Sequence, residues 1–276
     1  MEKTKTAACR NPAQKARVVN VLVLSEPAAN EPLVLIPGFM ADARSFMPQL
    51  AQLGADRPVI LLTPGLGDTV EKIAAEVAPH LPRRFALVAH GLGGNIAIEI
   101  LRKRPEAVTR VALIATDPLP ETPQLAAEQE ALLVAAKTGH LQACMAQMLP
   151  ITALHDAPWR DEVMALVMDM AENLGPTQFR RHLRVLQRRP DQQKTLRKVH
   201  VPTMIIAGES DTLVPRRRAE FLAAMMPQGC LEIIAEAGHL PQLEQPEAVT
   251  KVLKTFLAGR LPTLMLRQTA RSALTH

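Results

Sequence analysis

The sequence predicts an α/β fold in which a mostly parallel central sheet is flanked by helices and interrupted by an all-helical insertion. Short runs of Val, Ile and Leu alternate with helical stretches along most of the 276 residues, which is typical of a parallel sheet covered on both faces. Between Asp117 and Lys198 the strand signals disappear, and prolines separate helical stretches. A chain of this length fits one large domain with a substantial insertion.

Seven strands are expected, and four helices follow them most clearly. The apolar runs place the strands at residues 18–24, 33–37, 59–63, 85–90, 111–115, 203–207 and 231–234. The periodic stretches place the helices at residues 69–79, 92–103, 216–226 and 248–258. The last two strands cannot form a stable sheet by themselves, so they must join the earlier strands in one sheet.

This pairing of distant strands fixes the predicted domain organisation. Residues 17–117 and 199–260 form the core, residues 118–198 form a helical cap, and residues 1–16 and 261–276 are tails. An insertion at this point lies over the carboxyl ends of the strands, where open α/β sheets bind ligands. We therefore expect the ligand pocket between the core and the cap.

Composition excludes several classes of function. Hydrophobic residues make up 47% and charged residues 21%, as in a soluble globular protein. The net charge of +5 comes from 32 basic and 27 acidic residues without a basic patch, so no nucleic-acid partner is expected. Neither a secretory signal nor an apolar run of about 20 residues is visible, so no membrane partner is expected. The absence of tyrosine excludes a tyrosine-based active site.

The three cysteines, Cys9, Cys144 and Cys230, lie far apart and lack the spacing of metal ligands. They fit reduced thiols in a cytoplasmic protein. We expect no metal and no organic cofactor.

The most informative motif is a strand, a glycine-rich turn and a helix in residues 85–99. Its centre reads Ala89-His90-Gly91-Leu92-Gly93. This matches the G-x-S-x-G turn, in which a strained residue with positive φ lifts a nucleophilic serine above the sheet. Small residues around the turn let the helix pass close to the strand. Only the serine is missing, because Gly91 stands in its place.

Three further segments accompany this turn in a characteristic order. They read Leu35-Ile-Pro-Gly-Phe-Met-Ala-Asp-Ala-Arg, then Gly208-Glu-Ser-Asp followed by Val214-Pro215, then Gly238-His-Leu-Pro-Gln-Leu-Glu-Gln-Pro-Glu. With these motifs the chain resembles capped α/β-hydrolases of the esterase, lactonase and meta-cleavage-product hydrolase group. The resemblance covers about residues 17 to 258.

The resemblance implies catalytic roles for two side chains. Asp211 matches the acid of the triad and His239 matches the general base, and their order after the turn is the one this fold requires. Asp211 would hold the imidazole of His239 in the tautomer whose other nitrogen faces the substrate. Asp117, at the end of the strand after the turn helix, is the alternative acid.

The resemblance also implies an oxyanion hole made by the backbone N–H groups of Phe39 and Leu92. His90 matches the family pattern too, but we expect it to serve packing and hydrogen bonding. Three other histidines, His155, His182 and His200, are expected to be surface or core residues.

Gly91 has no side chain, so no covalent acyl-enzyme can form there. The chain's serines, Ser25, Ser45, Ser210 and Ser272, occupy no equivalent turn, and Cys144 belongs to the cap. Three explanations remain open: an engineered substitution, a natural paralogue that has abandoned hydrolysis, or a non-covalent enzyme in which His239 and Asp211 activate water or a substrate proton. The intact acid and base motifs favour recent loss, engineering or continued use of the pair.

The sequence therefore predicts a protein of the carboxylic ester, lactone or carbon–carbon bond hydrolase type that lacks its nucleophile and is inactive or weakly active. The alternatives are a non-hydrolytic small-molecule binding protein, and a lyase or cofactor-free oxygenase that uses His239 and Asp211. The expected ligand is small and largely apolar, and the expected assembly is a monomer or homodimer. The identity of the substrate is not encoded in any readable motif.

Overall fold

The computed structural model describes residues 31–63 and 65–259, and six parallel strands form its central sheet. The order across the sheet is β2-β1-β3-β4-β5-β6, and every neighbouring pair is parallel. The strands are β1 (Leu33–Ile36), β2 (Val59–Leu61), β3 (Phe85–His90), β4 (Val108–Ile114), β5 (Thr203–Gly208) and β6 (Gly229–Ile234). The predicted α/β fold is confirmed, while the strand expected at residues 18–24 lies outside the described residues.

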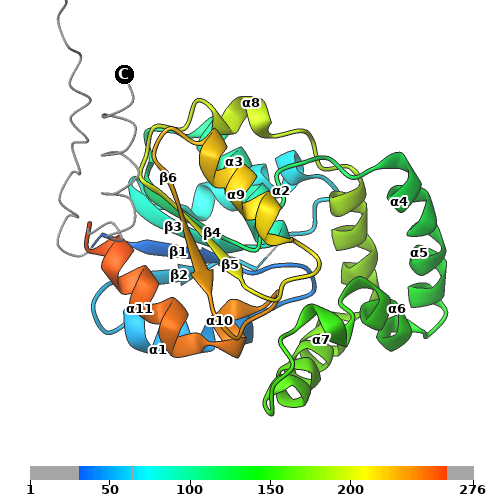
Figure 1. Ribbon diagram of the computed structural model, residues 1–276. Helices are drawn as coiled ribbons and strands as arrows, with labels where there is room; N and C mark the ends of the chain where they lie inside the picture. The colour runs from blue at the N-terminus through cyan, green and yellow to red at the C-terminus, as the bar shows by residue number, and fades with distance from the viewer. Residues whose placement is uncertain (1–30, 64, 260–276) are drawn as a thin grey trace, which may run out of the picture.

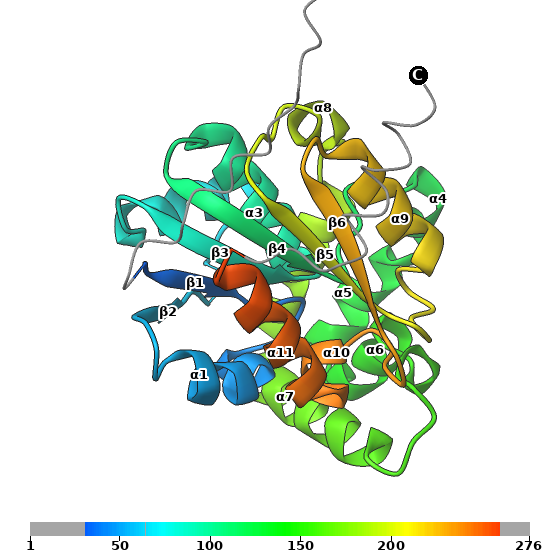
Figure 2. The same cartoon turned by 60° about the vertical axis from the view of Figure 1, so that its left-hand side comes forward.

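Helices cover both faces of the sheet (Figures 1 and 2). One face carries α2 (Val70–Val77), α3 (Leu92–Lys103) and α9 (Arg216–Met225). The other carries α1 (Met47–Leu53) and α11 (Pro246–Leu257), with the short α10 (Pro241–Glu244) beside them. Short 3-10 turns lie at Ala43–Phe46, Ala78–His80 and Ile151–Ala153.

The strand sequences explain why both faces are covered. All six residues of β3 are buried, as expected for a central parallel strand with an uninterrupted apolar run. Successive side chains alternate between the two faces. Phe85 and Leu87 thus join the core beneath α2, α3 and α9, whereas Ala86 and Val88 join the core beneath α1 and α11.

Residues 118–198, here called the helical segment, are all described and contain no strand. Their helices are α4 (Pro123–Glu128), α5 (Glu130–Lys137), α6 (Leu141–Met148), α7 (Arg160–Gln187) and α8 (Gln193–Leu196). The long α7 bends at Gly175, whose φ of 76° and ψ of 173° are not helical, and Pro176 follows. Across the described part of the chain, none of the helices is long and apolar enough to cross a membrane.

The helical segment has its own hydrophobic core, which reaches into two loops of the sheet domain. Met145, Phe179 and Leu183 of the segment share this core with Met40 and Leu240. Met40 follows β1, and Leu240 follows β6 at the start of α10. The segment therefore packs on the loops at the carboxyl ends of these strands.

Helix α3 passes very close to the end of β1 at Gly93, and this contact generates a stability prediction. A Cβ atom at residue 93 would lie 2.4 Å from the carbonyl oxygens of both Ile36 and Pro37. Because these are backbone atoms, Gly93→Ala must push α3 away from β1 and is expected to lower the free energy of unfolding by about 1–3 kcal/mol. Urea unfolding measures this, and an unchanged midpoint would contradict the close packing.

Candidate active site

The strand-to-helix turn at Gly91 has the backbone of a nucleophile-bearing turn. Gly91 joins β3 to α3 with φ of 50° and ψ of −116°, a conformation that costs a side-chain-bearing residue about 1–3 kcal/mol. Its N–H donates to the carbonyl of Ile114 on β4 at 2.9 Å. A Cβ at this position would approach only the carbonyl oxygen of Ala115, at 4.0 Å. A side chain would therefore have room, at the expense of backbone strain.

Asp211 and His239 form a hydrogen-bonded pair beside this turn. Nδ1 of His239 lies 3.0 Å from Oδ2 of Asp211. The other carboxylate oxygen of Asp211 accepts the N–H groups of Leu213 and Val214, each at 2.9 Å. This fixes the carboxylate, so the imidazole donates through Nδ1 and its Nε2 carries the free lone pair. His239 lines the pocket, while the carboxylate of Asp211 is buried beneath it.

Glu244, whose role sequence reasoning missed, holds the loop that carries His239. Its carboxylate accepts the N–H groups on both sides of the histidine, from Gly238 at 2.9 Å and from Leu240 at 2.9 Å. It also accepts the N–H of His155 in the helical segment at 2.7 Å. Glu244 is part of the Gly238-His motif, but its role depends on the fold of α10.

His90 lies directly beneath the pair and is fully buried. Its Nε2 donates to the carbonyl of His239 at 3.0 Å, and no partner for its Nδ1 is found among the described residues. A Cβ at Gly38 would lie 2.4 Å from that Nδ1. The loop that follows β1, here called the β1 loop, therefore packs directly on the ring of His90. Burial, assisted by the neighbouring His239, lowers the pKa of His90 to about 3. His90 thus remains neutral near pH 7, and its hydrogen bond supports the loop that carries His239.

The backbone N–H groups of Phe39 and Leu92, near the turn, are among those for which no acceptor is found in the described part of the chain. Leu92 is the first residue of α3, where N–H groups have no partner within the helix and attract negative charge. Both residues line the pocket. They are the two donors that the family resemblance implies for an oxyanion hole.

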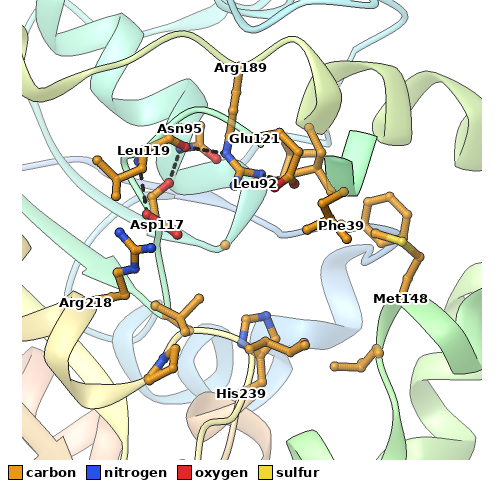
Figure 3. Close-up of a pocket in the computed structure, with 18 of the residues that line it drawn as sticks. Phe39, Leu92, Asn95, Asp117, Leu119, Glu121, Met148, Arg189, Arg218 and His239 are labelled. Carbon is orange, nitrogen blue, oxygen red and sulfur yellow. Dashed lines mark hydrogen bonds and ion pairs between the residues drawn. The ribbon is translucent and has the colours of Figure 1, made fainter. Parts of the chain in front are cut away.

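A pocket of about 820 Å³ opens between these loops and the helical segment. Figure 3 shows Phe39, Met148 and His239 around one part of it and a polar group at another. There Asn95 donates to the backbone carbonyl of Asp117 at 2.8 Å, and Arg189 pairs with Glu121 at 3.2 Å. The pocket therefore combines an apolar wall with a polar end.

The remaining predicted candidates lie elsewhere. Asp117, the alternative acid, lines the polar end of the pocket, and its Oδ1 accepts the N–H of Leu119 at 3.0 Å. No contact between Asp117 and the imidazole of His239 is found among the described residues. His200 is exposed, and His155 contacts the hydroxyl of Ser210 at 2.8 Å. His182 is fully buried beneath the β1 loop.

The burial of His90 generates a prediction about pH. The pKa of His90 in the folded protein lies below the ordinary histidine value. Between about pH 6.5 and 3 the unfolded chain therefore binds more protons than the folded chain, and the free energy of unfolding falls as the pH falls through this window. The parent is expected to be less stable at pH 5 than at pH 7. In His90→Gln this drop in the free energy of unfolding should be smaller by about 1–2 kcal/mol. Urea titrations at the two pH values measure the difference, and His80→Gln, at an exposed histidine, is the control. An unchanged pH dependence in His90→Gln would contradict the assignment.

Comparison with known proteins identifies the family to which the chain is similar. A family model described as "Alpha/beta hydrolase family" matches residues 33–252. A pimeloyl-[acyl-carrier protein] methyl ester esterase of Aromatoleum aromaticum is 30% identical over 209 residues, covering 71% of this chain and 83% of that protein. The biotin biosynthesis bifunctional protein BioHC of Teredinibacter turnerae is 27% identical over 88% of this chain, which spans only 48% of that longer protein.

Solved structures show the same fold. A thermophilic esterase from Thermogutta terrifontis superposes with a TM-score of 0.75 at 23% identity, covering 84% of this chain and 91% of that chain. The enol-lactonase from Burkholderia xenovorans superposes with a TM-score of 0.72 at 19% identity, covering 82% and 91%. Together with the family match over residues 33–252, which is most of the chain, these findings establish that this protein belongs to the alpha/beta hydrolase family and is esterase-like.

Proposed function

We propose that this protein binds a carboxylic ester or a related acyl compound in the pocket beside His239, and that it hydrolyses this compound feebly or not at all because Gly91 occupies the nucleophile position. The observation that carries the proposal is the positive φ of Gly91, with open space where a Cβ would lie, next to an ordered His239–Asp211 pair. The supporting groups of an esterase site are thus present around a position without a nucleophile.

The geometry limits what chemistry remains. With Asp211 on Nδ1, Nε2 of His239 can take a proton from a water molecule as the water oxygen attacks the ester carbonyl, and the N–H groups of Phe39 and Leu92 can stabilise the oxyanion that forms on the carbonyl oxygen. The imidazolium then returns the proton to the departing alcohol, and the carboxylic acid is released without an acyl-enzyme. Site groups that remain after the nucleophile is lost retain only about 10³–10⁴-fold acceleration over water.

The substrate class is proposed from the pocket and the relatives. A cavity of about 820 Å³ falls within the range of small-molecule sites, and its apolar wall suits an acyl chain. The named esterase relative acts on a pimeloyl-[acyl-carrier protein] methyl ester. We place the scissile ester at His239 and the acyl chain along the wall formed by Leu92, Met148 and Leu186.

The domain division belongs to the same proposal. The helical segment supplies pocket residues from several of its helices, including Leu125 of α4, Met145 of α6 and Leu186 of α7. We propose that it acts as a cap over the core formed by residues 17–117 and 199–260. Ligand choice then depends on cap side chains, as is usual for pockets at such junctions.

The proposal predicts a gain of function in Gly91→Ser. A hydroxyl at this position would have His239 as its base, so turnover of activated esters is expected to rise by about a hundredfold or more. The same substitution should cost about 1–3 kcal/mol of stability, because the backbone has positive φ. A panel of p-nitrophenyl esters of different chain length, assayed beside urea unfolding, measures both effects.

The matched control is Gly91→Ala, which introduces the same backbone strain without a nucleophile. It should lose similar stability and gain no activity. A second control, His239→Ala combined with Gly91→Ser, should abolish the gain. If Gly91→Ser is no more active than Gly91→Ala on the whole panel, the esterase assignment is wrong. Ligand binding without turnover in all variants would then support the alternative of a small-molecule binding protein.

A further inference from the structure

A buried histidine of the helical segment accepts a backbone hydrogen bond from the loop that follows β1. The N–H of Met40 donates to Nδ1 of His182 on α7 at 3.1 Å, across 142 residues of sequence. Both side chains are fully buried. Met40 has a φ of 48°, a conformation that residues with side chains rarely adopt and that persists only where the surroundings enforce it.

The same helix also fixes the residue before Met40. The ring of Phe39 makes an edge contact with Phe179, with centroids 5.4 Å apart, and a tilted contact with His182 at 5.9 Å. The hydrogen bond to Met40 fixes the peptide plane after Phe39, and these ring contacts fix its side chain. Groups on α7 therefore restrain both the side chain of Phe39 and the peptide that follows it, which limits how the Phe39 N–H can turn.

The bend in α7 makes this arrangement possible. Asp169, before the bend at Gly175, pairs with Arg44 beyond the same loop, whereas Phe179 and His182 come after the bend. A Cβ at Gly175 would meet nothing within 4 Å, so glycine is needed there for its backbone conformation and not for space. The two halves of α7 thus hold the β1 loop at two points.

The protonation state of His182 allows Nδ1 to accept the hydrogen bond from Met40. An N–H donor on Nδ1 requires that this nitrogen be unprotonated. Burial lowers the pKa of His182 to about 4, so the ring is neutral near pH 7. The proton of the neutral ring then lies on Nε2, which is 2.8 Å from the side-chain amide of Gln178, and the oxygen of that amide accepts it.

We propose that His182 is a positioning residue: by accepting the Met40 N–H it orients the Phe39 N–H toward the reacting carbonyl, so that the oxyanion hole is complete only when α7 is seated on the core. This rests on the proposed function, which assigns Phe39 as an oxyanion donor. No contact of His182 with the pair at Asp211 or with residue 91 is found among the described residues, so it acts through the β1 loop.

The first test measures the loop in the protein as it stands, by residue-resolved hydrogen exchange of the Met40 amide. His182→Leu removes the acceptor while filling the space, and exchange is expected to accelerate about tenfold or more, the equivalent of one lost hydrogen bond. His182→Asn, whose side-chain oxygen can reach the position of Nδ1, should restore protection. Leu183→Val, a buried change in the same core that removes no hydrogen bond to the loop, should leave the Met40 amide protected. Unchanged exchange in His182→Leu would overturn the proposal.

The second test asks whether the loop matters for chemistry, using the Gly91→Ser background and an activated ester. His182→Leu should lower kcat by about tenfold with little change in KM. A misdirected N–H donor stabilises the transition state less, while the bound ester is hardly affected. His182→Asn should recover most of kcat. Equal effects of His182→Leu and Leu183→Val on kcat would reduce His182 to an ordinary core residue and overturn the positioning role.

The two tests separate this inference from the proposed function. If Gly91→Ser is inactive, the esterase assignment fails, while the exchange of the Met40 amide still decides whether His182 fixes the loop. If Gly91→Ser is active but the exchange and kcat do not respond to His182→Leu, the assignment stands and this inference fails.

Discussion

The site depends first on how closely α3 passes the end of β1. Gly93 lets the first turn of this helix contact the backbone of Ile36 and Pro37, where any side chain would collide. The contact brings the N-terminus of α3 beside the β1 loop, so Leu92 and Phe39 lie on the same wall of the pocket (Figure 3). Two free N–H groups from segments far apart in the sequence are thereby placed together.

The rest of the site is held without any contribution from residue 91. Asp211 is fixed by N–H groups of its own loop, His239 by Asp211 and by Glu244, and the β1 loop by His182. None of these contacts involves a nucleophile. Glycine also relieves the strain that a serine would impose at positive φ. Replacing a serine by glycine at this position would therefore remove chemistry while leaving the surrounding frame stable, so the proposed acid, base and donors do not depend on a nucleophile at residue 91.

Much of this arrangement follows from local sequence patterns. The central strand β3 and helix α3 were predicted to the residue, because the apolar run and the glycine-rich turn are local signals. Strand β4 begins at Val108, three residues before its predicted start, since the buried Arg110 interrupts the apolar run; its guanidinium donates to the carbonyl of Phe256. The role of His182 had no sequence signal, because it depends on a contact across 142 residues. Likewise, only the fold distinguishes Asp211 from Asp117 as the partner of His239.

The central claim is that a complete set of esterase groups surrounds Gly91, and covalent labelling tests it most directly. A fluorophosphonate reacts with a serine only where a base and an oxyanion hole act on it together. Intact-mass measurement should find one phosphonyl group on Gly91→Ser and none on the parent or on Gly91→Ala. Absence of label on a folded Gly91→Ser protein, or equal labelling of the parent, would contradict the account.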